Sequence, residues 1–240
     1  MKYLYDGTFE GLLTVVFDGY KVLDAVHIGV DGGQLDFFET IKVTTDFDKA
    51  KRVAQGVEGR FGKAVLTDLH KIFLSKFEDK DDTIGQVIYG LYHHGPQYLQ
   101  SAEHGAIRYR EIVKNYTAEA HSYKGLLRFM VIQDGVLYAP FEPENDLLVY
   151  VTPHFIRRMP NESFLIHDVR RSKAACYAEG RCEILHVAEL AVEIGASEQA
   201  FQKLWKNFYD TVAIPARYNP NLMQSNMPKR YWRYLPEKKG

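Results

Sequence analysis

Residues 128–139 have the sequence RFMVIQDGVLYA, and this stretch decides the fold class. Two runs of apolar, strand-forming residues, 128–132 and 136–139, are joined across Asp134-Gly135, a dipeptide typical of tight hairpin turns. We therefore expect an antiparallel hairpin in the middle of the chain. Further strand-like runs follow it at 164–166, 174–177 and 182–187.

Helical patterns surround this sheet. Thr8 precedes apolar residues at three- and four-residue spacing, which predicts a capped helix, and Asp46 is placed to cap another that ends at the glycines near position 60. Short strands are expected at 3–6 and 35–43. Other expected helices cover 63–77, 82–93, 106–124, 152–159 (opening at Thr152-Pro153) and 197–208. The order predicts an α+β protein, with a small mixed or antiparallel sheet that contains a hairpin and is surrounded by several helices.

The length and composition describe an ordinary globular protein. The 240 residues are 46% apolar and 25% charged, which excludes a disordered or fibrous chain. We expect a single domain over 1–240, with a sub-boundary near 95–105 and a basic, aromatic C-terminal segment at 214–238. No apolar run approaches the roughly 18–20 residues of a membrane span. An acid at position six argues against a secretory leader, and two cysteines without a CxxC spacing argue against a disulfide framework. These features predict a cytoplasmic protein with no membrane partner.

Charge is distributed unevenly along the chain. The net charge is −1, yet residues 201–240 hold eight bases against only Asp210 and Glu237. The bases are Lys203, Lys206, Arg217, Lys229, Arg230, Arg233, Lys238 and Lys239. A basic end on an acidic body suggests an anionic partner. The alternative is that these side chains only solvate a helical terminus.

Several catalytic and binding motifs are absent from the sequence. It has no complete phosphate loop, dinucleotide fingerprint or nucleophile elbow, and neither HExxH nor paired-cysteine zinc spacing. The histidines at 93, 94 and 104 are better explained as exposed or capping residues at a helix end than as metal ligands. We therefore predict no cofactor and no metal site.

The middle of the chain is denser in reactive side chains. His121, His154 and Asp168 are candidates for acid–base catalysis if the strands near them share one sheet. The arginines that follow the same elements would hold an anion such as phosphate. They are Arg128, Arg158 and Arg171. The alternative is a set of surface salt bridges, each contributing about 0–1 kcal/mol.

The C-terminal segment interleaves bases with aromatic residues. Nucleic acids are bound by cations that meet phosphates and by flat rings on which unpaired bases stack. On this hypothesis Lys229, Arg230 and Arg233 contact phosphate, and Tyr231 or Trp232 stacks on a base. Arg217 and Asn219 would position the strand or a base edge. The alternative is a docked terminal helix that buries its aromatic rings.

The stretch YDGTFEGLL at 5–13 resembles the opening of a bacterial family described as "probable DNA metabolism protein". The chain shares its other marks in the same order: Arg128-Phe129, Leu137-Tyr138-Ala139-Pro140, His154-Phe155 with Arg158, Ile166-His167-Asp168 with Arg171, and MPKRYWRYLPE at 227–237. The resemblance spans nearly the whole chain.

The resemblance implies a context and not a reaction. Genes of this family lie beside that of a radical-SAM protein assigned to DNA modification or repair, and related domains are fused to uracil-DNA-glycosylase-like domains. It therefore implies a DNA repair or metabolism protein that binds DNA and acts with a radical-SAM partner. Two alternatives remain open: a hydrolase or glycosylase-like enzyme using the His/Asp/Arg site, and a protein-interaction module without DNA affinity.

Overall fold

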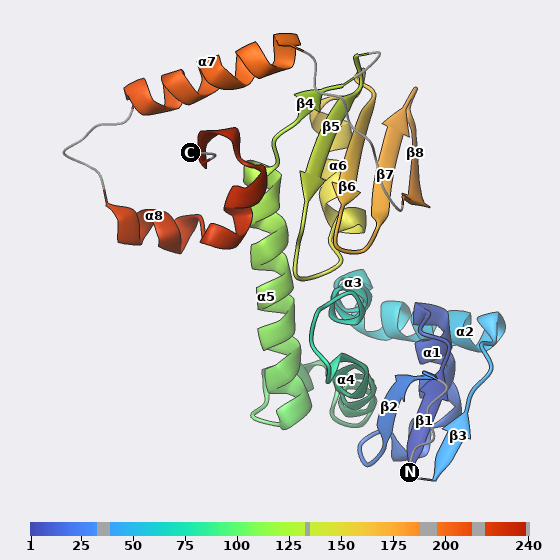
Figure 1. Cartoon of the computed structure of the whole chain (residues 1–240). Helices are drawn as coiled ribbons and strands as arrows, with labels where there is room; N and C mark the ends of the chain where they lie inside the picture. Colours follow the sequence, from blue (N-terminus) through green and yellow to red (C-terminus); the bar gives the residue numbers. More distant parts are fainter. Residues whose placement is uncertain (33–38, 133–134, 188–195, 213–218, 239–240) are drawn as a thin grey trace. The chain divides into compact units, whose positions relative to one another are not determined.

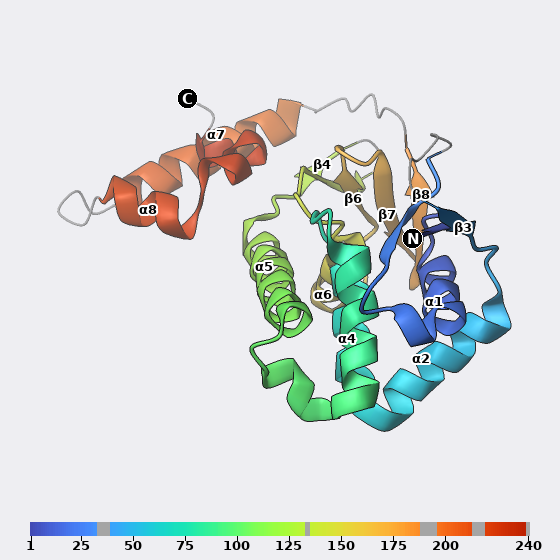
Figure 2. The same cartoon turned by 90° about the horizontal axis from the view of Figure 1, so that it is seen from below.

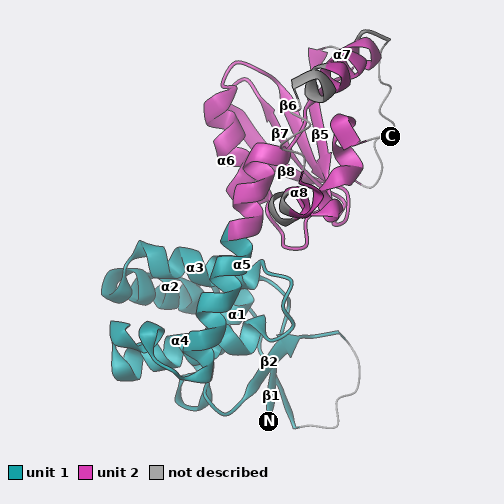
Figure 3. Ribbon diagram, turned by 90° about the vertical axis from the view of Figure 1, so that its left-hand side faces the viewer, with its two compact units in different colours: residues 1–117 teal, residues 118–240 magenta. Residues whose placement is uncertain are grey.

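A computed structural model describes residues 1–32, 39–132, 135–187, 196–212 and 219–238 (Figure 1). It confirms the α+β class, with helices and two separate sheets. The chain divides into two compact units, residues 1–117 and 118–240 (Figure 3). The division falls within helix α5 (His104–Leu126), which begins in unit 1 and ends in unit 2. It therefore lies beyond the 95–105 stretch. No helix in the described part of the chain is long and apolar enough to cross a membrane.

Unit 1 is built on a three-stranded parallel sheet in the order β2–β1–β3. Its strands are β1 (Lys2–Tyr5), β2 (His27–Val30) and β3 (Thr40–Lys42). Helix α1 (Phe9–Asp18) follows β1, as expected. The β2 strand was not predicted, since four residues are too few to show a clear alternation. Residues 35–38, expected as a strand, lie outside the described residues.

The turn before α1 confirms the predicted helix cap. The Thr8 hydroxyl accepts a hydrogen bond from the Gly11 N–H at 3.0 Å. Asp6 in turn accepts from the Thr8 backbone at 3.0 Å and from the Thr45 hydroxyl at 2.7 Å. Gly7 has a φ of 81°, a conformation that other residues adopt only with strain. The turn therefore fixes both the end of β1 and the start of α1.

Four helices complete unit 1: α2 (Phe47–Phe61), α3 (Lys63–Phe73), α4 (Lys80–His94) and the first part of α5. Asp46 caps α2 by accepting hydrogen bonds from the next helical N–H groups. The helix ends at Gly62, so Gly56 and Gly59 lie inside it and do not end it as expected. Helices α1, α2 and α4 lie together beside the strands in Figure 2. The apolar faces of these helices and of α3 form the core, with Leu12, Val57, Ile72, Ile84 and Leu91 fully buried.

Unit 2 is built on a five-stranded mixed sheet in the order β4–β5–β6–β7–β8. The predicted hairpin is confirmed, since β4 and β5 pair antiparallel with Met130 opposite Tyr138. The β5 and β6 strands are parallel, and β6 to β8 form an antiparallel meander. The strands are β4 (Met130–Val131), β5 (Leu137–Phe141), β6 (Phe164–Asp168), β7 (Lys173–Ala178) and β8 (Arg181–His186).

Helix α6 connects the parallel strands β5 and β6. It covers Leu148–Arg158, so the prediction that it opens at Thr152-Pro153 is wrong. Its buried apolar residues begin earlier, at Leu148 and Val151, and these place the first turn of the helix against the sheet. Pro153 therefore lies inside the helix and not at its first position.

In the C-terminal part of unit 2, the described residues form two α-helices and two short turns of 3₁₀-helix. Helix α7 (Ala196–Val212) matches the expected long helix, whereas α8 (Pro220–Asn226) was not predicted. The basic aromatic segment forms η5 (Lys229–Tyr234), followed by η6 (Pro236–Lys238). It is thus tighter than the expected α-helix.

Candidate nucleic-acid interface

Unit 2 contains a cavity of about 330 Å³ between α7, the C-terminal turns and the strand β4. This volume is within the range of about 300–1,000 Å³ that is usual for small-molecule sites. Its walls are aromatic and apolar, with four polar side chains among them. We call it the aromatic pocket; it is lined by Leu127, Arg128, Phe129, Met130, Arg158, Glu198, Phe201, Gln202, Trp205, Tyr234 and Pro236.

Two buried carboxylates hold the walls of the aromatic pocket in place. Glu237 accepts hydrogen bonds from the Arg128 guanidinium at 2.8 Å and from the Trp205 indole at 3.1 Å. Glu198 accepts from the Val131 N–H at 3.1 Å and so ties α7 to the edge of the sheet. Because both carboxylates are buried, the loss of any of these contacts leaves a desolvated charge with fewer hydrogen-bond donors. The indole of Trp205 therefore has a fixed position.

Tyr234 closes the aromatic pocket from the C-terminal side. Its hydroxyl donates a hydrogen bond to Glu142 at 2.6 Å. Burial, together with that carboxylate, raises the pKa of Tyr234 well above its ordinary value. The phenol thus stays neutral, and its ring presents an uncharged flat surface.

A basic patch, defined here as Lys124, His154, Arg157 and Arg158, lies at the end of α6 and the neighbouring turn of α5. Arg157 and Arg158 are exposed, and neither forms an ion pair with any residue that the structure describes. Cations in the last turn of a helix also interact favourably with its dipole. The patch therefore carries positive charge that the described part of unit 2 does not neutralise.

The imidazole of His154 lies within this patch. Burial lowers the pKa of His154, and the charges of Lys124, Arg158 and Arg157 lower it further. Its Nε2 is buried and makes no hydrogen bond within the described residues. The side chain is therefore a neutral imidazole among cations at pH 7.

The low pKa of His154 has a consequence for stability. The folded-state pKa lies below the unfolded value of about 6.5, so the contribution of this residue is present above pH 6.5 and is lost as the pH falls through the folded-state pKa. We expect the free energy of unfolding to decline in acid, and His154→Gln to make that decline shallower. Denaturant unfolding between pH 7.5 and 5 measures this. Equal slopes for both proteins would contradict it. Burial also lowers the pKa of His167, so part of the decline should remain in the variant.

The predicted acid–base trio is not joined by any direct contact among the described residues. Asp168 is fully buried at the end of β6 and forms an ion pair with Arg171 at 2.8 Å. Burial raises the pKa of Asp168, and Arg171 opposes that rise. His121 is exposed on α5, and His154 belongs to the basic patch. A proton would therefore have no direct hydrogen bond along which to pass between them.

The three arginines predicted to bind phosphate are in different situations. Arg128 is held by Glu237, as described above. Arg171 is held by Asp168 and also donates to the backbone carbonyls of Pro143 and Glu144. Arg158 alone of the three is exposed without a carboxylate partner in the described structure. It is the arginine available to an anion.

The C-terminal segment is docked on unit 2. Tyr231 is buried, and its ring meets that of Tyr123 edge-on at 4.8 Å, so it cannot stack on a base without leaving the core. The Trp232 indole donates to the Met227 carbonyl at 2.9 Å and is half-buried. Of the other predicted residues, Lys229 and Asn219 are exposed, and Arg217 lies outside the described residues.

The two described arginines of the segment face carboxylates. Arg230 lies 3.3 Å from Glu144, and Arg233 donates to Glu142. Both guanidiniums also rest on the ring of the tyrosine that follows each of them. A phosphate would have to compete with these acids.

The residues that sequence reasoning missed are the aromatic walls, Phe129, Phe201, Trp205 and Tyr234. Phe201 and Trp205 are four residues apart on α7, which was predicted only as a helix, with no binding role for its aromatic residues. The exposed fraction of Phe201 is 61%, so this face is not buried. No group of metal-ligating side chains occurs among the described residues.

A family model covers most of unit 2 and the helices that precede it. The match extends over residues 78–237 and carries the description "domain of unknown function (DUF4130)". It includes α4, α5 and all the residues of the aromatic pocket and the basic patch. No curated protein matches the chain. Because the match covers well over half of its length, the chain belongs to the DUF4130 family.

Proposed function

We propose that the protein binds DNA through unit 2, with an unpaired base in the aromatic pocket and the adjoining phosphates on the basic patch. The observation that carries this is the position of Arg158. The same unpaired guanidinium lines the aromatic pocket and belongs to the basic patch. A base and its own phosphate lie within one nucleotide of each other, so one residue at both sites suits this ligand.

The chemistry of the two sites is complementary to a nucleic-acid strand. Stacking of a base on an aromatic side chain contributes about 1–3 kcal/mol and tolerates any base. Cations that meet phosphates release counterions, which makes the affinity fall with salt. Because a base inside a duplex is already stacked, the aromatic pocket should favour single strands.

The resemblance extends this proposal to a process. We propose that the protein serves DNA repair or metabolism in the cytoplasm and that a radical-SAM partner carries out the chemistry. The family resemblance carries this part of the proposal. The hydrolase or glycosylase-like alternative would need His121, His154 and Asp168 to act together, and among the described residues no direct hydrogen bond joins them.

A second candidate function is a protein-interaction module. Phe201 and Leu204 on α7 have exposed fractions of 61% and 66%, which is high for large apolar side chains. A partner protein that covers this face would bind without any DNA. This alternative predicts co-purification with the radical-SAM protein and no oligonucleotide affinity.

Fluorescence anisotropy of labelled single- and double-stranded oligonucleotides, over a salt series, tests the proposal. We expect a preference for the single strand and an affinity that falls with salt. Replacing Arg157 and Arg158 together by Gln should weaken binding roughly tenfold and reduce the salt slope by about 1–1.5, since each phosphate contact on a single strand contributes about 0.7.

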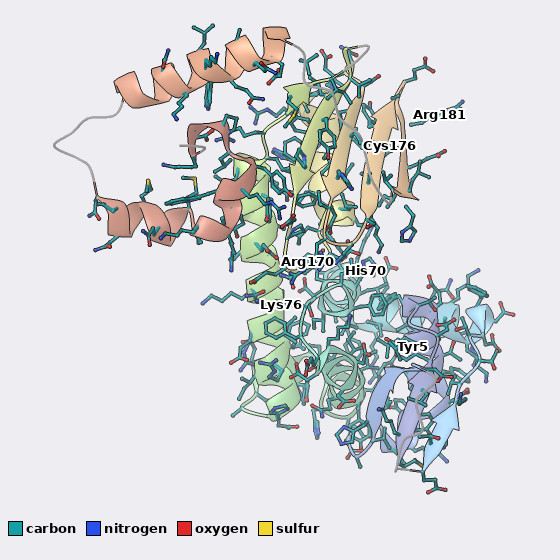
Figure 4. All side chains as sticks on the ribbon, in the orientation of Figure 1. Tyr5, His70, Lys76, Arg170, Cys176 and Arg181 are labelled. Carbon is teal, nitrogen blue, oxygen red and sulfur yellow. The ribbon has the colours of Figure 1, made fainter. Side chains whose placement is uncertain are left out.

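A matched control is Arg181→Gln, which removes an exposed cation from the edge strand β8, away from both sites (Figure 4). It should leave the affinity and the slope nearly unchanged. A loss of binding free energy for Arg181→Gln about half that of the double variant would mean that only net charge matters, since the control removes one cation and the double variant two. An absence of binding at low salt would refute the DNA proposal and favour the interaction module.

A further inference from the structure

Unit 1 contains its own cavity, separate from the residues discussed so far. It measures about 330 Å³ and lies among α1, α2, α4 and the 3₁₀ turn η1 (Tyr20–Val22). Figure 2 shows the three helices side by side. We call it the unit-1 pocket; it is lined by Val16, Phe17, Tyr20, Arg52, Val53, Ile88 and Tyr92. Its lining thus combines an apolar floor, three aromatic rings and one cation.

The rings at this site are ordered by stacking on one another. Tyr20 lies over His93 with a centroid distance of 5.9 Å and an interplanar angle of 19°. His93 in turn stacks on Tyr89 at 3.9 Å. Tyr20 meets Tyr92 edge-on at 5.9 Å, and its exposed fraction is 37%. A partly exposed flat ring is therefore held in one orientation at the pocket.

Tyr92 is fixed by the backbone of α2. A methyl group added at Gly56 would lie 2.6 Å from the Tyr92 hydroxyl, so the tyrosine ring would have to move to make room for it. Phe61 meets the Tyr92 ring edge-on at 5.2 Å. Burial raises the pKa of Tyr92, which keeps its hydroxyl protonated and able to donate a hydrogen bond. The pocket wall is rigid and carries a neutral polar group.

Two guanidinium groups adjoin these rings. Arg52 lies 5.1 Å from the centroid of Phe17, and Arg60 lies 5.3 Å from that of Tyr92. Both are exposed, and neither forms an ion pair within the described part of the chain. The neighbouring Lys49, by contrast, is paired with Asp18 at 2.7 Å. Cation–π contacts at exposed sites contribute only about 0.5–1 kcal/mol each, so both arginines keep their charge available to an anion.

We propose that the unit-1 pocket is a second base-binding site. An unpaired base of a nucleic-acid strand would lie against Tyr20 and Tyr92, and Arg52 and Arg60 would meet its flanking phosphates. A base has a flat face for stacking, polar edges for a tyrosine hydroxyl and an adjacent negative charge, and the lining provides for each of these. The inference rests on the proposed function only in taking nucleic acid as the ligand, since the residues of the two sites are all different.

Photochemical crosslinking locates the bound bases. The full chain is irradiated with a short single strand that carries 5-iodouracil in place of thymine, and the crosslinked peptides are identified by mass spectrometry. We expect crosslinks to Tyr20, Tyr92 or His93, in addition to those in the aromatic pocket of unit 2. Tyr20→Ala and the double change Arg52→Gln with Arg60→Gln should each reduce the unit-1 crosslinks at least about fivefold, the lower limit for one lost stacking contact.

A control variant and a folding test accompany these measurements. Lys114→Gln removes an exposed cation from α5 within unit 1 and should leave every crosslink in place. Circular dichroism tests whether each variant is folded. We expect all of them to fold, because Tyr20, Arg52 and Arg60 are exposed.

Crosslinks confined to unit 2 would overturn the second site and leave the proposed function standing. Crosslinks confined to unit 1 would support the second site and overturn the aromatic pocket as the binding site. Unit-1 crosslinks that survive both sets of variants would overturn this inference. Crosslinks in neither unit would refute both proposals.

Discussion

Arg171→Met is expected to lower the free energy of unfolding of unit 2 by about 3–5 kcal/mol, the usual effect of leaving a buried charge without its partner. Asp168 is fully buried and depends on the Arg171 guanidinium at 2.8 Å. The same guanidinium holds the carbonyls of Pro143 and Glu144, so the loop between β5 and α6 loses its attachment as well. Chemical denaturation measures the change. Arg170→Met is the control, because Arg170 is exposed in the turn after β6 (Figure 4) and should cost less than about 0.5 kcal/mol.

The effect of Arg171→Met should depend on pH in a defined direction. Burial raises the pKa of Asp168 above its unfolded value of about 3.9, and removing Arg171 raises it further. Stability from a carboxyl with a raised pKa is fully present below the unfolded value and is lost as the pH rises through the folded-state value. The deficit of the variant should therefore be largest at pH 7 and shrink towards pH 4. A deficit that is constant with pH, or equal to that of Arg170→Met, would contradict this account.

Trp205→Ala is expected to produce the largest loss of DNA affinity. It removes a wall of the aromatic pocket, and one lost stacking contact of about 1–3 kcal/mol corresponds to a roughly 5- to 150-fold weaker single-strand affinity. Double-strand affinity should change much less, since paired bases do not enter the pocket. Anisotropy with both oligonucleotides at one salt concentration measures the difference.

Trp205→Phe distinguishes stacking from the structural role of the indole. It keeps an aromatic ring but loses the 3.1 Å hydrogen bond to Glu237. If stacking matters, Phe should retain most of the single-strand affinity that Ala loses. Equal losses for Phe and Ala would show that the contact with Glu237 is what holds the site together. Equal losses of single- and double-strand affinity would contradict base binding in the pocket.

The local features of the fold could be predicted because their causes are local. The caps at Thr8 and Asp46 depend on hydrogen bonds over two or three residues, and the hairpin of β4 and β5 on pairs no more than eight positions apart. Such contacts depend on a few consecutive residue types, so the sequence displays them directly. The α+β class followed from these elements.

The candidate site could not be predicted in the same way, because distant residues form it. Arg128 and Glu237 are 109 positions apart, and no spacing rule relates them. Tyr231 was predicted to stack on a base. Its burial depends on Tyr123, which belongs to another element, so the neighbouring residues in the sequence do not show it. The short β2 strand and the early start of α6 also depend on packing against neighbours. Sequence patterns singled out Arg158, which is exposed and has no carboxylate partner among the described residues, but they did not single out the rings beside it.

Arg230 forms an ion pair with Glu144, and Arg233 forms one with Glu142. These pairs reduce the positive charge that the basic C-terminal segment can offer to an anion. These two arginines have internal counter-ions, supplied by the loop after β5. A phosphate arriving there would take part in an ion exchange, in which one anion replaces another on the same guanidinium. The displaced carboxylate takes up a cation from solution, so the exchange releases fewer counterions on balance and gains less Coulomb energy than binding to a bare cation. At long range the segment therefore attracts a polyanion more weakly than its bases would without these two pairs.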